Sequence, residues 1–127
     1  LLALRFFELR ALGVLGFQPQ LHFCVACQAP LEPTTNYFDP GAGGVLCPRH
    51  GEEVRSAPPL ALPTFKVLRY MQTQPWDRVA GFQLKPETHL DVEAVLQRFI
   101  VHILERRLKS VEFIYRLRRE TTLQPTR

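Results

Sequence analysis

The chain has 127 residues, 46% of them hydrophobic and 22% charged, with a formal net charge of +4. This length supports one modest core, and the composition is that of a globular protein. No stretch reaches the roughly eighteen uncharged apolar residues that a membrane span needs, and charges interrupt the apolar start, so we expect neither a membrane protein nor a signal peptide. We predict one cytoplasmic domain, residues 1–127, and the start without Met indicates part of a longer protein.

The first predicted element is an amphipathic helix over residues 1–15. Apolar residues recur there at near-helical spacing and predict a buried stripe made of Leu4, Phe7, Leu12 and Leu15, widened by Phe6 and Leu9. Gly16 follows as the residue expected to end the helix in the left-handed conformation.

Two pairs of metal-ligating residues come next, Cys24-x2-Cys27 and Cys47-x2-His50, with 19 residues between them. Two ligands three positions apart on a tight turn can take adjacent corners of a tetrahedron, and a second pair completes it. The two pairs use all three cysteines of the chain, so no disulfide partner remains. We predict one zinc ion, which is structural because four protein ligands leave no position for a reactive water.

Two alternatives stay open for these residues. Cys24 and Cys27 could form a redox pair with Cys47 as a buried thiol, although residues 21–30 lack the strand-helix context of such pairs. His22 could also replace His50 as the fourth ligand, at a strained spacing from Cys24.

Residues 20–55 are rich in Pro, Gly and Asn rather than periodic in apolar residues. Short strands at 35–38 and 44–47, separated by the turn at 39–43, predict a β-hairpin. Zinc would substitute for the apolar core that so short a segment lacks. The expected fold class is therefore mainly α, a helical domain with residues 20–55 as a small zinc-stapled β-hairpin, or zinc-finger-like insertion.

The second half predicts more helices. A Pro-rich connector at 57–63 leads to a helix at 64–72 with Thr64 as its N-cap and Phe65, Leu68 and Met71 on one face. A turn-rich segment then brings three further side chains to the core, Trp76, Val79 and Phe82.

The longest predicted helix begins at Pro86 and runs to about residue 107. Its inward residues are expected to be Val92, Val95, Leu96, Phe99, Ile100, Ile103 and Leu104. Lys109 and Ser110 mark a predicted joint before a short last helix that carries Val111, Ile114 and Leu117.

Positive charge gathers in the C-terminal quarter. Residues 1–97 carry eight Lys/Arg and nine Asp/Glu, whereas residues 98–127 carry eight and three. With Phe113 and Tyr115 as stacking surfaces, this cluster fits a phosphate backbone or an acidic peptide, and the alternative is a solvated helix face. The candidate DNA contacts are Arg106, Arg107, Lys109, Arg116, Arg118 and Arg119.

No catalytic motif is found. The only serines, Ser56 and Ser110, lack a Gly-x-Ser-x-Gly context, and the sequence contains neither a P-loop nor a dinucleotide fingerprint. His89 and His102 stand alone. We therefore expect a binding protein and not an enzyme.

Several short motifs follow one another in order along the chain: RFFELR at 5–10, LGF at 15–17 with Pro19 and Leu21, the Cys24/Cys27 pair, GGVLCP at 43–48 and RLKS at 107–110. In the order and spacing of these motifs, residues 2–117 resemble the C-terminal region of the RecO family of bacterial recombination mediators. Many family members have four cysteines, and here His50 stands where the fourth would be.

The resemblance implies an N-terminal oligonucleotide-binding (OB) barrel that this chain lacks, followed by the helical, zinc-bearing domain. It implies DNA repair in the nucleoid-associated cytoplasm, with single- and double-stranded DNA as partners, strand annealing, and loading of recombinase together with RecR and often RecF. It also implies docking of the acidic, Phe-terminated tail of a single-stranded-DNA-binding protein. Arg5, with Leu9 and Leu12 as an apolar wall, is the candidate site, and simple pairing of Arg5 with Glu8 or Glu52 is the alternative. If the site lies elsewhere, Arg69 and Arg98 are the next candidates.

A different class of function is a free-standing zinc-ribbon DNA-binding regulator. Base readout would need several side chains near the zinc that can reach base edges. The hairpin offers Asn36, Arg49 and Arg55 at most, so we rank this function second.

Overall fold

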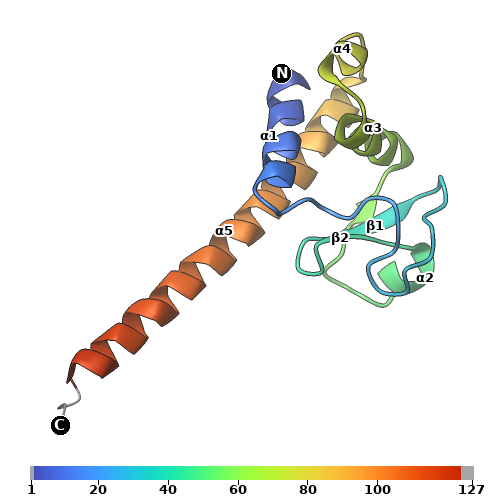
Figure 1. Cartoon of the computed structure of the whole chain (residues 1–127). Helices are drawn as coiled ribbons and strands as arrows, with labels where there is room; N and C mark the ends of the chain where they lie inside the picture. The colour runs from blue at the N-terminus through green and yellow to red at the C-terminus, as the bar shows by residue number, and fades with distance from the viewer. Residues whose placement is uncertain (1, 124–127) are drawn as a thin grey trace.

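The computed structural model describes residues 2–123, with side chains to residue 121. Within this range no helix is both long and apolar enough to span a membrane. Figure 1 shows a long helix, α5, with a compact body gathered around its N-terminal half. The elements in chain order are α1 (Leu2–Val14), β1 (Asn36–Asp39), β2 (Gly44–Leu46), α2 (Pro48–Gly51), β3 (Pro59–Leu60), α3 (Leu62–Thr73), α4 (Trp76–Val79) and α5 (Pro86–Leu123).

Helix α1 buries a different face from the one that the sequence predicted. Its buried residues are Leu2, Phe6, Leu9 and Leu12. Leu4, Phe7 and Leu15 are 50%, 63% and 68% exposed, so the predicted stripe was wrong in these three members. Apolar residues occupy two sides of this helix, and contact with α3 and α5 decides which side is covered. Gly16 has a φ of 87° and ends the helix as predicted.

Arg10 ties α1 to the C-terminal end of α3. Its Nε donates to the carbonyl of Met71 at 2.9 Å, and Nη2 donates to the carbonyl of Gln74. Met71 lies in the last turn of α3 and Gln74 is the C-cap residue, so neither carbonyl has an intrahelical donor. The guanidinium also lies over the Phe6 ring, 4.9 Å from its centroid. Arg10 therefore stabilises the packing of two helices, a role that the sequence did not indicate.

The sheet has the strand order β2-β1-β3, with both pairs antiparallel. Tyr37 lies opposite Leu46 in the hairpin, and the turn contains Gly43 with a φ of 86°. The predicted hairpin is confirmed to within one residue at each end. The third strand, β3, was not predicted, because the Pro-rich residues 57–63 indicated a connector. In the structure Leu60 of β3 pairs with Asn36, at the edge of β1 that β2 leaves free.

The zinc-ligand segment belongs to the main core. Phe38 and Val45 are 1% and 0% exposed, and Leu21 and Leu31 join the same buried cluster as the helices. The Phe38 and Phe99 rings meet edge to face with centroids 5.8 Å apart. The expectation that a metal would stand in for a missing core was wrong, because β1 and β2 supply the buried apolar side chains of Phe38, Val45 and Leu46 directly.

Helix α3 begins earlier than predicted, with Ala61 as the N-cap residue and a proline in the first turn. Thr64 is therefore not the cap; it is buried within the helix, with Oγ1 3.5 Å from a carboxylate oxygen of Asp91. Phe65, Leu68 and Met71 are buried as predicted. In the next segment Val79 is fully buried, whereas Trp76 lies at the edge of the core against the Phe6 ring.

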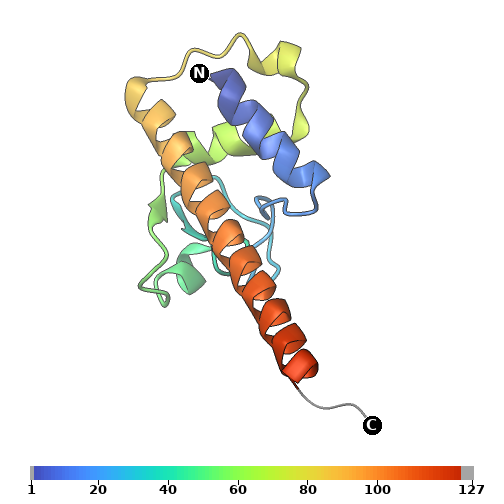
Figure 2. The same cartoon turned by 90° about the vertical axis from the view of Figure 1, so that its left-hand side faces the viewer.

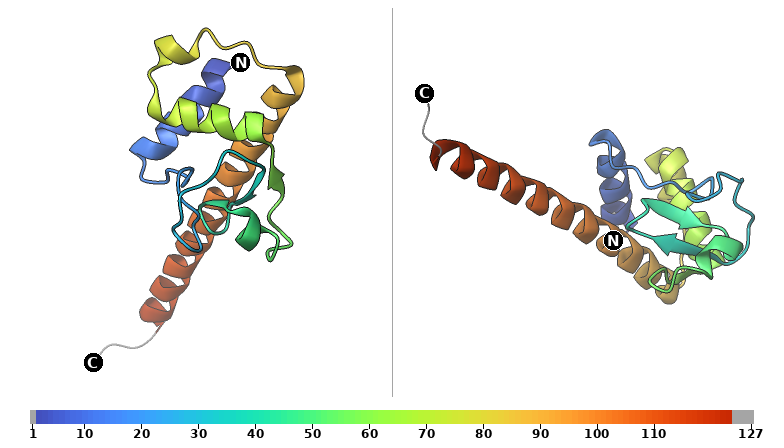
Figure 3. Two further views of the ribbon diagram at one scale, coloured as in Figure 1. Left: turned by 90° about the vertical axis from the view of Figure 1, so that its right-hand side faces the viewer. Right: turned by 90° about the horizontal axis from the view of Figure 1, so that it is seen from below.

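Helix α5 runs without a break from Pro86 to Leu123, so the predicted joint at Lys109 and Ser110 was wrong. No Gly or Pro lies inside it to break the helix. Val92, Val95, Leu96 and Phe99 are buried, and Ile100 and Ile103 pack at the edge of the core. Leu104 is 55% exposed, against the prediction. The C-terminal half extends away from the body, as Figures 1 and 3 show.

Candidate metal centre and basic cleft

The four predicted ligands come together at one point. The Sγ atoms of Cys24, Cys27 and Cys47 and a ring nitrogen of His50 all lie within 4.8 Å of one another. Cys47 Sγ and His50 Nδ1 are 3.2 Å apart. Bonds of about 2.3 Å to sulfur and 2.0 Å to nitrogen put tetrahedral ligands roughly 3.5 Å apart, so this donor set fits zinc.

Backbone pairing with β2 positions the first ligand pair. The Val45 amide donates to the Gln20 carbonyl at 2.9 Å, and the Val25 amide donates to the Val45 carbonyl at 3.1 Å. Gln28 then takes a φ of 64°, and its amide donates to the Cys24 carbonyl at 2.8 Å. This tight turn directs both sulfur atoms of the pair toward the same point.

The second ligand pair sits on the first turn of α2. Cys47 is the N-cap residue, and its carbonyl accepts from the Gly51 amide at 2.8 Å. Residues three apart on a helical turn share a face, so Cys47 and His50 point the same way. A Cβ at Gly51 would overlap the Tyr37 ring, which explains why glycine follows the histidine.

His22 takes no part in this cluster. It lines a different pocket, beside Arg69. Burial, followed by the charge of Arg69, lowers its pKa. The structure therefore favours His50 over His22 as the fourth ligand. It also favours a metal over a redox pair, because a third thiol and an imidazole reach the same point as Cys24 and Cys27.

Local hydrogen bonds favour the thiolate form of Cys24. Burial alone would raise the pKa of this thiol, but donors that include the backbone amides of Cys47, Cys27 and Ala26 outweigh it and lower the pKa to about 6. The amide of Ala29 acts to lower the pKa of Cys27, yet desolvation and the neighbouring thiols raise it overall. One ligand is thus prepared as an anion at neutral pH, the form that binds metal.

A pH dependence follows for the metal-free protein. The pKa of Cys24 falls from its usual value of 9.0 to about 6 in the fold. Between these two pH values the unfolded chain therefore binds more protons than the folded chain. The free energy of unfolding should therefore rise with pH through this window and lose the contribution below it. Urea unfolding of chelator-treated protein from pH 6 to pH 9, with Cys24→Ser as the control, measures the slope. An equal slope in both proteins would contradict the assignment.

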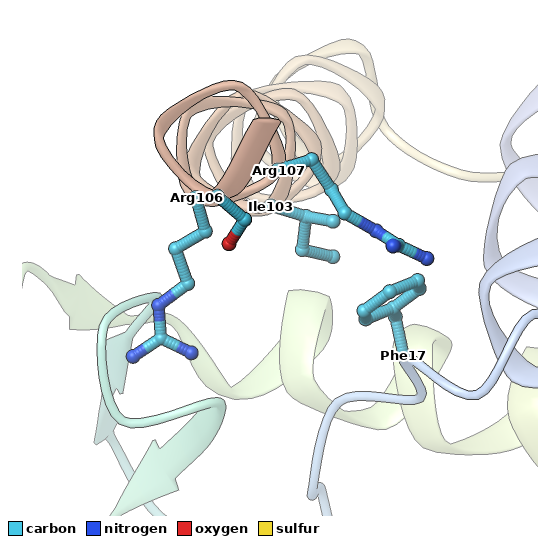
Figure 4. A pocket seen from close by; sticks show the side chains of 5 residues that line it. Phe17, Ile103, Arg106 and Arg107 are labelled. Carbon is cyan, nitrogen blue, oxygen red and sulfur yellow. The ribbon is translucent and has the colours of Figure 1, made fainter. Parts of the chain in front are cut away.

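Arg106 and Arg107 flank a cleft of about 400 Å³ where α5 leaves the body. We call this the basic cleft; its lining is Phe17, Ile103, Arg106, Arg107 and Ser110. Arg106 donates to the Gly41 carbonyl at 3.3 Å, and the Arg107 guanidinium lies 5.1 Å from the centroid of the Phe17 ring. Figure 4 shows the two guanidinium groups on opposite sides, with Phe17 beneath Arg107.

The other predicted DNA contacts lie further along α5. Lys109, Arg116, Arg118 and Arg119 are exposed on the half of the helix that extends beyond the body. The structure thus brings two of the six predicted residues to a cleft. The other four lie at exposed positions along the protruding half of α5. Phe17 was not among the sequence candidates, since its place beside α5 depends on the loop after α1.

Arg5, Leu9 and Leu12 do not form an open groove. The Arg5 guanidinium lies 3.1 Å from Glu8 and 3.5 Å from Glu93. Leu9 and Leu12 are 2% and 7% exposed and belong to the core. This geometry counts against Arg5 as the residue that takes a peptide carboxylate and agrees with the alternative of pairing, with Glu93 in the place of Glu52.

A second basic pocket, of about 420 Å³, lies on α3 and contains Arg69, the next candidate after Arg5 for the peptide site. The sequence did not predict the pocket itself. We call it the α3 pocket; its lining includes His22, Pro33, Phe65, Lys66, Arg69 and Tyr70. The Arg69 guanidinium lies 5.0 Å from the Phe65 ring centroid, and no carboxylate of the described residues forms an ion pair with it. Helical spacing of Lys66, Arg69 and Tyr70 could have indicated one face, whereas Pro33 reaches it only through the fold.

The zinc-ribbon regulator gains no support from the geometry. The helix beside the metal ligands, α2, has four residues. A helix this short presents about one turn, whereas base readout places several side chains of a longer helix in the major groove.

Comparisons with known proteins agree with the resemblance. The family model described as "Recombination protein O C terminal" matches residues 1–112. The chain is 42% identical over 113 residues to the DNA repair protein RecO of Roseiflexus sp. (strain RS-1), covering 89% of this chain and 40% of the relative. It is 36% identical over 117 residues to that of Symbiobacterium thermophilum, covering 91% and 46%. The chain thus spans less than half the length of these relatives. No solved structure matches it significantly.

Proposed function

This chain belongs to the RecO family, as its C-terminal region, and on that premise we propose that it serves DNA repair as the helical, zinc-bearing part of a recombination mediator. The whole protein would anneal strands and load recombinase. We propose a binding role without catalysis, in the cytoplasm and near the nucleoid. We further propose that residues 1–127 act as one domain with 20–55 as its insertion, which the shared core supports.

We propose that the insertion binds one structural zinc ion. Four donors supplied by two ligand pairs support this, as does the burial of Cys24. Zinc would then hold residues 20–31 against α2, and its role would be structural rather than chemical.

The proposed contact with DNA rests on the geometry of the basic cleft. Two guanidinium groups flank an apolar floor formed by Phe17 and Ile103. A phosphate can bind between the cations while an unpaired base stacks on the ring, and the cations beyond the cleft can follow neighbouring phosphates. We propose that single strands, and duplexes through phosphates alone, bind along this part of α5.

Neutralising Arg107 and Lys109 together should weaken binding of single-stranded DNA without altering sequence preference. The slope of log K against log salt should fall by about 1.4, because each lost contact removes roughly 0.7. Fluorescence anisotropy across a salt series measures both quantities on the 127-residue chain and on the longer protein. The control is Arg55→Gln with Arg78→Gln, which removes the same charge away from the cleft. If the slope of log K against log salt were equal in the two double variants, the basic cluster would be a solvated helix face that makes no DNA contact.

We propose the α3 pocket as the site for the acidic tail of a single-stranded-DNA-binding protein, in place of Arg5. Arg69 and Lys66 offer cations beside an apolar wall of Phe65, Tyr70 and Pro33. A carboxylate suits the planar fork of arginine, and a terminal ring suits the apolar wall. RecR, and RecF with it, are proposed as further partners on family membership.

Arg69→Ala should weaken binding of a tail peptide about tenfold or more, because a charge-assisted bidentate contact is lost. Isothermal calorimetry with the acidic peptide measures this directly. Arg5→Ala is the matched control, since the Arg5 guanidinium already pairs with Glu8 and Glu93. If the Arg5 variant loses affinity and the Arg69 variant keeps it, the original candidate is right.

A further inference from the structure

The three thiols of the candidate metal centre differ in their access to solvent. Cys24 is fully buried, Cys47 is half-buried and Cys27 is exposed. Their sulfur atoms lie within 4.8 Å of one another. Figure 2 shows the green helix α2, which follows Cys47 and carries His50, at the periphery of the body, below α1 and α3. A small reagent in solution therefore meets this cluster first at Cys27, where two further thiols lie beside the exposed one.

Cys24 and Cys27 lie on one turn that a disulfide can close. The Gln28 amide donates to the Cys24 carbonyl at 2.8 Å, so a single α-turn encloses both cysteines. Residues three apart on such a turn have Cβ atoms about 5–6 Å apart, and a disulfide needs about 3.5–4.5 Å. Residues 26–30 are exposed, so the turn can tighten without displacing the core. A bond to Cys47 would instead have to draw this turn and the start of α2 together.

The buried member of the pair is placed to complete that disulfide. Cys24 has no exposed surface, so a dissolved reagent does not reach its sulfur directly. Its Sγ accepts from the Ala26 amide at 3.4 Å, which holds the sulfur on the inner side of the turn next to Cys27. An exposed thiol beside a protected one is the arrangement of a redox-sensing cysteine with its resolving cysteine.

We propose that Cys27 and Cys24 form a reversible oxidation site for hydrogen peroxide. The Cys27 thiolate attacks one peroxide oxygen; the O–O bond breaks, the sulfur becomes a sulfenic acid and hydroxide leaves. The Cys24 thiolate then attacks the sulfur of Cys27; the S–S bond forms, the S–O bond breaks and a second hydroxide leaves. In total the two thiolates lose two electrons, which reduce one molecule of peroxide to two hydroxide ions.

The oxidation site differs from a redox pair that takes the place of a metal, because its reduced form is the metal centre itself. In this respect it rests on the zinc site proposed above, although closure of the disulfide does not need zinc. The disulfide removes two of the four ligands, and Cys47 with His50 cannot complete a tetrahedral site. Residues 20–31 then stay attached to β2 through hydrogen bonds such as the one from Val25 to Val45. Peroxide thus loosens the insertion.

The test begins with the wild-type chain, purified without oxygen and treated with an excess of hydrogen peroxide. Free thiols should fall from the three of the sequence to one per chain, and a chromogenic chelator should report one zinc ion released for each disulfide formed. Peptide mapping by mass spectrometry should place the bond between Cys24 and Cys27. Dithiothreitol with added zinc should restore all three thiols and the bound metal, because a disulfide is reduced by thiol exchange.

Two matched variants test the role of the exposed thiol. Cys47→Ser should still close the disulfide, because the pair lies on one turn. Cys27→Ser should keep both remaining thiols reduced over the same time, because neither is exposed. Circular dichroism shows whether each variant retains its helices, and the mapping on the wild-type chain decides the outcome without any variant.

A disulfide mapped to Cys47, a Cys27 oxidised beyond the sulfenic acid without a bridge, or equally fast thiol loss in the Cys27 variant overturns the proposal. A wild-type chain that holds zinc and keeps three free thiols in excess peroxide refutes the oxidation site alone. A chain that contains no zinc but closes the Cys24–Cys27 disulfide refutes the metal centre and supports the oxidation site.

Discussion

Cys24→Ser is expected to abolish stoichiometric zinc binding and to lower the free energy of unfolding by several kcal/mol, because the binding energy of a structural zinc is largely folding energy. Cys24 is fully buried, and its sulfur accepts from the Ala26 amide at 3.4 Å. Serine is too short and too weak a ligand to replace a thiolate at this position. The segment that runs beside β2 would lose its attachment to α2.

Metal analysis after anaerobic purification, together with urea unfolding, measures both effects. His50→Ala should also lose zinc, whereas His22→Ala should retain it, because only His50 reaches the three sulfur atoms. Wild-type protein that contains no zinc, or a Cys24 variant as stable as the wild type, would refute the metal centre. If the His50 variant retained zinc and the His22 variant lost it, the fourth ligand would be His22 and not His50.

Phe38→Ala should lower the free energy of unfolding by about 3–5 kcal/mol, the usual cost of removing a buried aromatic ring. Phe38 is 1% exposed on β1, and its ring contacts Phe99 of α5. The substitution therefore opens a cavity between the hairpin and the helix. Because this contact joins the insertion to the main core, the chain should unfold as one unit, with loss of zinc and of helix at the same denaturant concentration.

Phe113→Ala is the control for this measurement, since the Phe113 ring is 57% exposed. It should change the unfolding free energy by less than about 0.5 kcal/mol, as most exposed substitutions do. If the Phe38 variant unfolded in two separate steps, or lost less than about 1 kcal/mol, the insertion would be an independent module stabilised by zinc alone.

A hydrogen bond also links the hairpin to the basic cleft. Gly41 lies in the turn between β1 and β2, and its carbonyl accepts from Arg106. A hairpin loosened by loss of zinc would release this contact. Removal of the proposed zinc should thus change the position of the Arg106 guanidinium and alter the proposed DNA contact, although Cys47 and His50 follow the far end of β2 from the turn that contains Gly41.

The sequence by itself determined the features that depend on residues close together in the chain. Cys24 with Cys27, and Cys47 with His50, are fixed by their spacing because a ligand pair needs only a local turn. The hairpin, the end of α1 at Gly16 and the start of α5 at Pro86 follow from backbone preferences of Gly and Pro that act within a few residues. Family resemblance rests on the same local motifs, and the match over residues 1–112 bears it out.

Only the tertiary structure decided which surfaces remain open. Helix α1 has apolar residues on two sides, and packing against α3 and α5 covers Phe6 and Leu9 while Phe7 stays exposed. Arg5 could have faced a ligand, but Glu93 of a distant helix pairs with it. The basic cleft and the α3 pocket each bring together side chains that are far apart in the sequence. Periodicity tells which residues share a face of a helix, but what that face meets depends on contacts between distant segments, which no local pattern encodes.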